Sequence, residues 1–467
     1  MFPRLIFLFC LSFGVLPCFA ASDPFSLEEA LVAPCPNPGQ NAMPENALAL
    51  ADVIDLALCH NPKTRAAWAS AKVEAALKGV AQAAYLPNLD AAVGGSWQRS
   101  KIERESTPTT NSQNADLSFS YLLFDFGGRA ANLESHRQLL NAAIAQQDTT
   151  RQAVFLEAVQ AFYQVHASIA AVEAAKTSEM AAKRSLDAAD ARLKAGIVTS
   201  VDKLQAQTAF SQAELNRIRL EGQWRSAEGT LASTLGLDAN RPVRLESPGR
   251  LFSGISLERM GRVEDFSARL EALMEAAKRE RPDLRAAEAR YQASKASVSV
   301  ARAQGLPSLR FGASAGQRRV EHLDSQSGSF NLTLNIPLFS GFADTYQIRA
   351  AEAREEASAI ELERLLQQAS LEVWQSWQAL RTAAQSLSTT SALFASAEAA
   401  ERMALGRYQA GVGNILDLLN AQSALADARM QRISAAYDWH MSRAAFARAL
   451  GRLDKRLLDE PFSFVKP

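Results

Sequence analysis

Few side chains in this 467-residue sequence are spaced to carry out chemistry. The histidines are scattered, and none lies in an HExxH pattern, which would place two imidazoles on one helix face around zinc. There is no GxxxxGK[ST] loop to hold a phosphate, and no local context suggests a Ser, His and Asp set. We therefore expect no enzyme activity, no metal and no cofactor. The histidines are His60, His136, His166, His322 and His440.

The four cysteines are divided between an N-terminal leader and the rest of the chain. Residues 1–20 combine an early basic residue, a short apolar run and the ending CFA, which is the layout of a cleaved signal peptide. A membrane anchor would need about 20 apolar residues, and Pro17 before Cys18 argues against lipidation. An even pair of cysteines in an oxidising compartment favours a disulfide between Cys35 and Cys59, with two free buried thiols as the alternative.

Two aspartates, Asp202 and Asp417, occupy the same place in the similar stretches AGIVTSVDKLQAQ and AGVGNILDLLNAQ. Each falls in the first turn of a helix that follows a glycine break, where the helix dipole favours a carboxylate. One interpretation of these aspartates is therefore purely structural. The residues expected to form the turns and caps are Gly196 with Thr199 or Ser200 in the first stretch, and Gly411, Gly413 and Asn414 in the second.

The overall composition excludes some functions. The 50 basic and 50 acidic side chains give a net charge near zero, so the chain lacks the basic surplus that nucleic-acid binding needs. Alanine is the commonest residue, which is typical of long helices with closely packed backbones. No run after the leader supplies the 18 uninterrupted apolar residues expected of a membrane-spanning helix.

The sequence contains an internal duplication. ADVIDLALCHNPKTRAA resembles EALMEAAKRERPDLRAA at an offset of 220, and RLKAGIVTSVDKLQAQ resembles RYQAGVGNILDLLNAQ at an offset of 215. The change of offset falls in a loop, where a difference in length costs little free energy. The expected division is a signal peptide (1–20), a Pro-rich arm (21–48), a first repeat (49–236), a linker (237–265), a second repeat (266–451) and a C-terminal tail (452–467).

Each repeat is expected to contain a helix, two strands, a very long helix and a shorter helix. Apolar and polar residues alternate in the strand segments, so one face is aliphatic or aromatic and the other is small and polar. Strands are expected at about 89–99, 115–126, 308–318 and 330–340, with ERESTPTTNSQN as a polar loop. The expected strand-to-helix junctions are Gly127, Gly128 and Gly341. The expected apolar face comprises Leu117, Phe119, Tyr121, Leu123, Phe330, Leu332, Leu334, Ile336 and Leu338.

The long helices need a partner. From Arg129 to Lys194 there are 66 residues without Pro or Gly, and Ala343 to Leu405 is likewise uninterrupted. At 1.5 Å per residue each could run about 100 Å, and such a helix requires a coiled neighbour. Trp374 and Trp377 are expected to be core residues. Helical hairpins are expected at 129–235 and 342–450.

Four strands cannot close a barrel by themselves. Their expected length of roughly 9 to 11 residues suits strands tilted in a bilayer. An open edge in hydrocarbon would leave about five N–H and C=O groups unpaired at several kcal/mol each. Either the sheet lies outside a membrane, or identical chains close it together, and three chains would supply twelve strands and twelve helices.

The order of the motifs NPKTRAA, AYLPNL, LLFDFGGR, IPLFSGF and the paired AG stretches, spread over about residues 48 to 452, resembles the TolC family of outer-membrane efflux and secretion ducts. The stretch ALCHNPKTRAAW is similar to the CyaE-type branch, which exports haemolysin-type toxins by type I secretion. The resemblance implies a mainly α fold with a small β part. It also implies a homotrimer whose 12-stranded outer-membrane β-barrel continues into a long periplasmic α-helical barrel.

Members of this family close the periplasmic end with helix tips and an acidic constriction. The resemblance implies a pore constriction at Asp202, Tyr408, Asp417 and Asn420, with Tyr408 in the position of a latch tyrosine. Asn420 stands where TolC has a further aspartate, and Gly413 stands where it has an arginine. We therefore expect packing and fewer hydrogen bonds, rather than a charge latch, to hold the shut state. Such a mouth would favour cations.

The expected partners are two further copies of this chain, the lipid bilayer, a periplasmic adaptor (membrane-fusion) protein and an inner-membrane ABC exporter or drug pump. We expect a passive exit duct for type I secretion of a protein such as an RTX haemolysin-type toxin, because the chain lacks a good lipidation site. One alternative is the outer-membrane component of a multidrug efflux pump. A remote alternative, from another class, is a soluble periplasmic coiled-coil adaptor.

Overall fold

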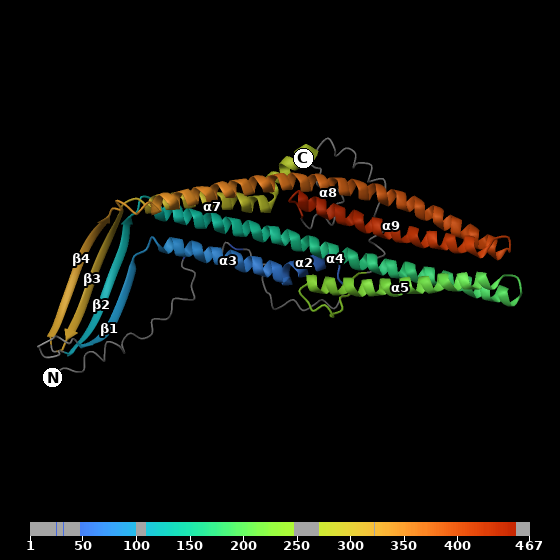
Figure 1. Cartoon of the computed structure of the whole chain (residues 1–467), viewed down its shortest axis with the longest axis horizontal. Helices are drawn as coiled ribbons and strands as arrows, with labels where there is room; N and C mark the ends of the chain where they lie inside the picture. The colour runs from blue at the N-terminus through green and yellow to red at the C-terminus, as the bar shows by residue number, and fades with distance from the viewer. Residues whose placement is uncertain are drawn as a thin grey trace. The chain divides into compact units, whose positions relative to one another are not determined.

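The computed structural model describes residues 47–99, 109–246, 270–321 and 323–453, together with Phe25 and Leu31. The chain divides into two compact units, one around Ala69–Asn141 and Gln292–Glu356 and the other around Ala142–Tyr291 and the residues from Ala357. Figure 1 labels the elements. The helices are α2 (Leu50–His60), α3 (Pro62–Ala83), α4 (Gly128–Lys194), α5 (Ser200–Thr234), α6 (Leu270–Glu280), α7 (Pro282–Gln304), α8 (Ala343–Gln409) and α9 (Ile415–Ala449). The strands are β1 (Asn88–Arg99), β2 (Thr109–Phe124), β3 (Ser308–Val320) and β4 (Leu323–Asn335).

The first unit contains an antiparallel sheet in the order β1-β2-β3-β4, drawn as arrows in Figure 1. Residues directly opposite each other share a face, so the register shows which side chains lie together. Leu89 pairs with Phe119, and Phe119 pairs with Ala313. Ala313 in turn pairs with Phe330, so one apolar row crosses all four strands.

The opposite face of the sheet is small and polar. Ser118 pairs with Asp90 on one side and with Ser314 on the other. Ser314 pairs with Ser329, and their hydroxyl oxygens are 2.8 Å apart. The alternation expected from the sequence is therefore present in the sheet. It gives one face suited to an apolar environment and one suited to water.

The expected strand limits need correction. β2 starts at Thr109, so residues expected in a polar loop instead pair with β1, as Asn114 does with Gly94. β4 ends at Asn335, so Ile336 and Leu338 lie beyond the strand and are exposed. Proline lacks the N–H that a ladder needs, and Pro337 follows immediately.

One residue of the expected apolar face is displaced by a bulge. The register between β2 and β3 shifts between Leu122 and Phe124, so Phe124, not Leu123, pairs with Leu309. A bulge inserts one residue and increases local twist, and such irregularities are common where a strand ends. Leu117, Phe119 and Tyr121 keep the expected alternation. On β4 the same is true of Phe330, Leu332 and Leu334.

The strand-to-helix junctions use four left-handed residues rather than three glycines. Gly127 has φ +89° and Gly341 has φ +63°, as a sharp change of direction requires. Gly128 is the first residue of α4 and has no positive φ. Two aromatic residues, Phe126 (φ 50°) and Phe342 (φ 66°), also adopt this conformation, which costs a non-glycine residue about 1–2 kcal/mol.

The second unit contains the greater part of two helical hairpins, α4 with α5 (teal to green in Figure 1) and α8 with α9 (orange to red). The long helices α4 and α8 each have 67 residues. One core cluster includes Val159 and Phe162 of α4 with Leu231 of α5. The other includes Trp377 of α8 and Phe446 of α9, whose ring centroids are 5.8 Å apart.

Two further expectations are wrong in detail. Trp374 was expected in the core, but its side chain is half exposed in the single chain. The single helix expected before the strands of the first repeat is two helices, because Asn61 is extended, with φ −60° and ψ 129°, and separates α2 from α3. A residue before proline disfavours the helical conformation, and Pro62 is the first residue of α3.

Within these described ranges, none of the helices has both the length and the apolar character needed to cross a bilayer. Cys59 is disulfide-bonded. Cys35, its expected partner, lies outside the described residues.

Candidate functional site

The tip of the first hairpin connects α4 to α5 through a tight turn. Gly196 has φ +71°, and the N–H of Ile197 donates to the Arg192 carbonyl at 2.9 Å, which is the pattern of a glycine-ended helix. Thr199 caps α5 in a capping box with Asp202. The Thr199 N–H and hydroxyl donate to Oδ2 of Asp202 at 2.8 and 2.9 Å. The half-buried Asp202 carboxylate is therefore already engaged in starting a helix.

The tip of the second hairpin has the same turn but a different cap. Gly411 has φ +79°, and the Asn414 side chain accepts from the N–H of Asp417 at 2.8 Å. The exposed Asp417 carboxylate has no hydrogen bond or ion pair within the described part of the chain, nor does the exposed Asn420 side chain. Asp417 and Asn420 are one helical turn apart, so both lie on one face of α9. Of the two aspartates expected at a constriction, Asp417 is therefore the one whose carboxylate is not engaged within the described chain.

Gly413 does not need a left-handed conformation, because no positive φ occurs there. Glycine is required here because there is little room for a side chain. A Cβ at this position would lie 3.1 Å from Cβ of Arg407 and 3.2 Å from the N atom of Tyr408. The N–H of Gly413 also donates to the Arg407 carbonyl at 3.1 Å, so the turn folds back closely on the end of α8.

Tyr408, the expected latch tyrosine, is buried in a small cluster with Ile415 and Leu418. Its hydroxyl has no hydrogen-bond partner within the described chain. The residue that engages it comes from the other hairpin. Arg192 of α4 donates to the carbonyls of Tyr408 and Gln409, at 2.6 and 3.2 Å, and its guanidinium lies 4.2 Å from the centroid of the Tyr408 ring.

Sequence reasoning missed Arg192 as a functional residue. It sits at the start of the repeated stretches RLKAGIV and RYQAGVG, so its duplication as Arg407 was a visible signal. What the sequence could not show was the acceptor, because backbone carbonyls carry no residue type. A cation at the end of α8 also complements the negative end of that helix dipole. Arg192 is therefore a tie between the two hairpins of one chain.

A charged cluster joins α4 and α5 at the first tip. Asp190 binds Lys194 and Lys203 at 2.7 Å each. The hydrogen bond from Lys194, followed by that from Lys203, lowers the pKa of Asp190 to about 2. This carboxylate remains charged at any physiological pH and holds the α5 start against α4. Asp190 is thus a structural anion.

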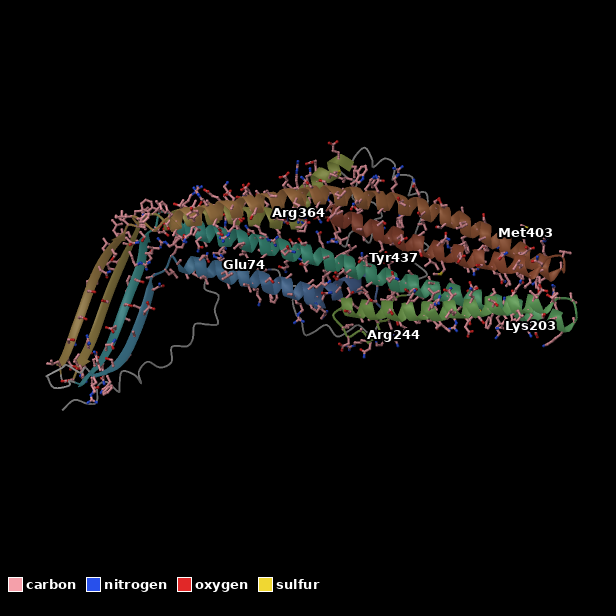
Figure 2. All side chains as sticks on the ribbon, viewed as in Figure 1. Glu74, Lys203, Arg244, Arg364, Met403 and Tyr437 are labelled. Atoms are coloured by element: carbon pink, nitrogen blue, oxygen red, sulfur yellow. The ribbon has the colours of Figure 1, made fainter. Side chains whose placement is uncertain are left out.

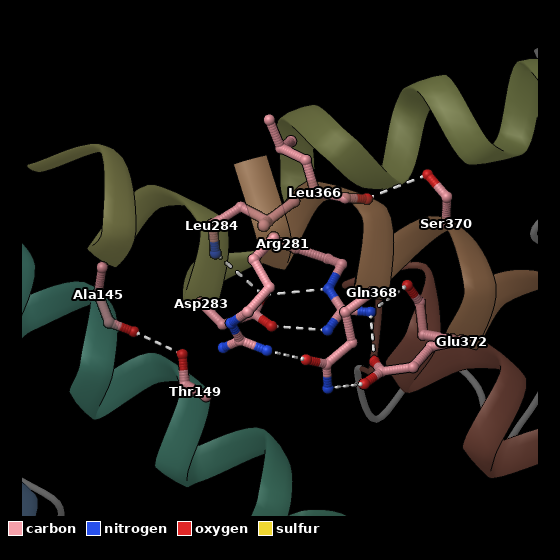
Figure 3. Close-up of polar contacts among 11 residues, drawn as sticks. Ala145, Thr149, Arg281, Asp283, Leu284, Leu366, Gln368, Ser370 and Glu372 are labelled. Carbon is pink, nitrogen blue, oxygen red and sulfur yellow. Dashed lines mark hydrogen bonds and ion pairs between the residues drawn. The ribbon is translucent and has the colours of Figure 1, made fainter. Parts of the chain in front are cut away.

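A second polar cluster, shown in Figure 3, lies at the break between α6 and α7. The buried Arg281 pairs with Asp283 at 2.6 Å and with Glu372 at 2.7 Å. It also donates to the Ala449 carbonyl at 3.4 Å. Burial raises the pKa of Asp283, but the bonds from Arg281 outweigh it, and the net shift is downward. A cavity of about 240 Å³ lies beside this cluster, with Thr149, Gln152 and Arg448 in its wall.

The first repeat has a neutral counterpart of this cluster. Asn61 donates to the carbonyl of Thr234 at 2.9 Å, and Thr234 corresponds to Ala449 at an offset of 215. Gly236 and Gly451, related by the same offset, have φ +74° and +76°. A Cβ on Gly236 would lie 2.5 Å from the His60 carbonyl oxygen. In both repeats the residue at the helix break therefore fixes the end of the second hairpin helix.

The described residues contain no group of His, Cys, Asp or Glu side chains arranged to hold a metal ion. Asp417 and Asn420 at the second hairpin tip keep polar side chains without a hydrogen bond or ion pair in the described part of the chain, whereas Arg281 and Asn61 at the helix breaks are paired. Such an arrangement can bind cations weakly, hold helices together or release them. It offers no nucleophile paired with a base.

Comparison with known proteins gives a family match along most of the chain. The family model described as outer membrane efflux protein matches residues 53–237 and 273–452. Protein CyaE of Bordetella pertussis is 32% identical over 435 residues, covering 91% of this chain and 88% of that protein. Outer membrane protein OprJ of Pseudomonas aeruginosa is 26% identical, covering 79% of this chain and 77% of that protein.

Two solved structures have the same fold. The CusC channel aligns with a TM-score of 0.74 at 21% identity, covering 90% of this chain and 97% of that chain. The Campylobacter jejuni CmeC outer membrane channel aligns with a TM-score of 0.75 at 19% identity, covering 86% of each chain.

Proposed function

The chain belongs to the outer membrane efflux protein family, and we propose that it is the exit duct through which a tripartite system secretes a protein by type I secretion. Its location is the outer membrane. The observation that carries the proposal is the two-faced sheet of four strands, whose outer edges on β1 and β4 have no partner strand within the described chain.

Closure by identical copies follows from the free energy of those edges. β1 and β4 have 12 and 13 residues. In hydrocarbon, about half of the backbone groups along each edge would lack a partner, at several kcal/mol per group. Pairing β4 of one copy with β1 of the next removes both edges. Three copies give a 12-stranded barrel with the apolar row outside and the serine-rich face lining water.

The sequence contains no nucleotide-binding loop, so the energy for transport has to come from a partner. We propose an inner-membrane pump and a periplasmic adaptor as these partners. The hairpins α4–α5 and α8–α9 would continue the barrel as a helical tunnel. The constriction at its end would contain Asp417, Asp202, Asn420 and Tyr408.

Protein secretion is favoured over drug efflux by sequence similarity. The identity to CyaE is 32% and covers 91% of the chain, whereas the identity to the toluene efflux protein TtgI of Pseudomonas putida is 24% over 86%. The CyaE-type resemblance implies a haemolysin-type cargo. Efflux of small molecules is the second candidate, because several proteins named as parts of efflux pumps are also similar over most of the chain.

Deletion of the gene in its own host separates the two candidates. We expect one large secreted protein to disappear from the culture medium, while sensitivity to solvents and antibiotics stays unchanged. Expression of the wild-type chain from a plasmid should restore secretion of that protein. Increased drug sensitivity with an unchanged set of secreted proteins would replace secretion by efflux.

A further inference from the structure

The contact made by Arg192 joins the two hairpins inside one chain, and its counterpart in the second repeat is Arg407. We propose that Arg407 makes the equivalent contact between chains, donating to the carbonyls of Leu193 and Lys194 of a neighbouring copy. This inference rests on the proposed assembly of identical copies into a duct. It adds the residues that would join the periplasmic tips of neighbouring copies.

A ring built from copies that each contain two similar hairpins has two kinds of junction, one within a copy and one between copies. If the hairpins are similar, the face that the first presents to the second inside the chain must recur at the junction between chains. At an offset of 215, Arg192 becomes Arg407 and the acceptors Tyr408 and Gln409 become Leu193 and Lys194.

The arginine at the junction within the chain has hydrogen-bond acceptors, whereas its counterpart has none within the described residues. Arg192 is half-buried and has two carbonyl acceptors. The Arg407 side chain is exposed and has no hydrogen bond or ion pair within the described residues. Its acceptors would belong to a copy that a single chain does not contain.

Apolar residues on the same two hairpins show the same contrast. Ala188 of α4 packs against the Tyr408 cluster of the other hairpin, but its counterpart Met403 is 69% exposed. Met430 of α9 packs against the α4–α5 cluster, but its counterpart Leu215 is 46% exposed. Met403 is labelled in Figure 2 towards the tip of its hairpin. A second copy would cover these side chains in the same way as the chain covers Ala188 and Met430.

The two junctions are not equal in strength. Tyr408 supplies an aromatic ring under Arg192, whereas the counterpart under Arg407 is Leu193, which has no ring. The hydrogen bond between Ser185 and Gln422 is also lost, because residue 400 is alanine. The junction between copies is therefore the weaker one, and a mouth that opens would part there first.

The decisive experiment uses two differently tagged copies of the full chain, each with one added cysteine, purified together from membranes. Leu193→Cys in one copy and Arg407→Cys in the other should give a covalent heterodimer with a short bismaleimide. Arg192→Cys and Tyr408→Cys in separate copies form the matched control, and they should give none, because that contact lies within a chain. Unmodified chain reports the background from native cysteines.

The outcomes distinguish this inference from the proposed function. A trimer that conducts ions but gives no heterodimer from the 193/407 pair overturns the inference and leaves the duct intact. A heterodimer from the control pair with none from the 193/407 pair also overturns it. Material that is monomeric and does not conduct overturns both.

A second measurement does not depend on added cysteines. Leu193→Tyr should place a ring under Arg407 and lower the open probability of single channels about two- to fivefold. Arg407→Gln should raise it. If both variants, recovered as trimers, conduct as the wild type does, Arg407 does not hold the mouth.

Discussion

At the scale of single residues, His166 is the clearest case of a buried group without a polar partner. It is 1% exposed, neither ring nitrogen has a hydrogen-bond partner, and the Phe162 ring lies 4.5 Å away. Burial lowers its pKa from 6.5 to about 4. Between about pH 6.5 and about pH 4, the imidazole therefore stays neutral in the folded chain but is protonated in the unfolded chain.

The sign of the pH dependence follows from this. As pH falls below about 6.5, the unfolded state binds a proton that the folded state refuses, so stability is lost at ~1.4 kcal/mol per pH unit until about pH 4. We expect His166→Leu to flatten the fall in melting temperature between about pH 7.5 and about pH 5. His136→Gln, a less buried position on α4, is the control and should keep the wild-type fall. Equal slopes for His166→Leu and wild type would show that His166 does not cause it.

The two aspartates that we propose for the pore constriction, Asp202 and Asp417, should differ in their effect on ions. Asp202 accepts from Thr199 in a capping box, whereas the Asp417 carboxylate is free within the described chain. We expect Asp417→Asn to relieve most of the divalent-cation block of single-channel current and the double change with Asp202→Asn to relieve the rest. Asp202→Asn alone should mainly weaken the start of α5, by about 0.5–2 kcal/mol. Unchanged block in the double variant would remove both residues from the pore.

At the residue scale, the sequence predicted the features that depend only on neighbouring residues, namely the helix caps and the glycine turns. The caps Thr199 and Asn414 and the turns Gly196 and Gly411 follow from residue type and position, and the structure has them. Arg192 was missed because its acceptors are carbonyls of a segment more than 200 residues away. Long-range partners of that kind leave no mark in a single sequence.

At the scale of elements, close approach of the backbone explains why some turn glycines matter more than others. Gly236→Ala combines a left-handed φ of +74° with a Cβ only 2.5 Å from the His60 carbonyl oxygen. Gly196 has a similar φ of +71° but nothing within 4 Å. We expect Gly196→Ala to cost about 1 kcal/mol and Gly236→Ala to cost at least about twice as much. Melting temperatures measured in one detergent compare them, and similar losses would contradict the close-approach explanation.

The Arg281 cluster should contribute more to stability than ion pairs on the helix surface. Arg281 has two carboxylate partners and a side chain that is 10% exposed. Arg281→Met leaves Asp283 partly buried without its cation, at a cost of about 3 kcal/mol. The control is Arg364→Met, which removes an exposed pair with Glu361 and should cost at most about 1 kcal/mol. Thermal unfolding of the two variants tests this, and a smaller loss at Arg281 would refute it.

Elements were predicted in type and, apart from the division of the first helix of each repeat into two, in order, but strand limits were not. The last strand was expected at about 330–340, but β4 begins at Leu323, and the polar residues Ser325 to Ser329 pair with β3. Polar residues can extend a hairpin when the partner strand is already in place, and a single sequence does not show the partner. The bulge at Leu123 is invisible for the same reason.

At the scale of the whole molecule, the sequence indicated an internal duplication. It also indicated that further copies of the chain are needed to close the sheet. The edges of β1 and β4, which have no partner strand within the described chain, and the exposed Met403 and Leu215 all support the proposed assembly of identical copies. The number of copies was implied by family resemblance, because the strand pattern alone fixes only that the edges must be covered.

The most direct test is the mass and conductance of the purified full-length chain. In detergent we expect a particle of three copies, and in a planar bilayer we expect discrete ion-conducting steps that divalent cations block from the side of the helical tips. A particle of one copy that leaves the bilayer non-conducting would contradict the account.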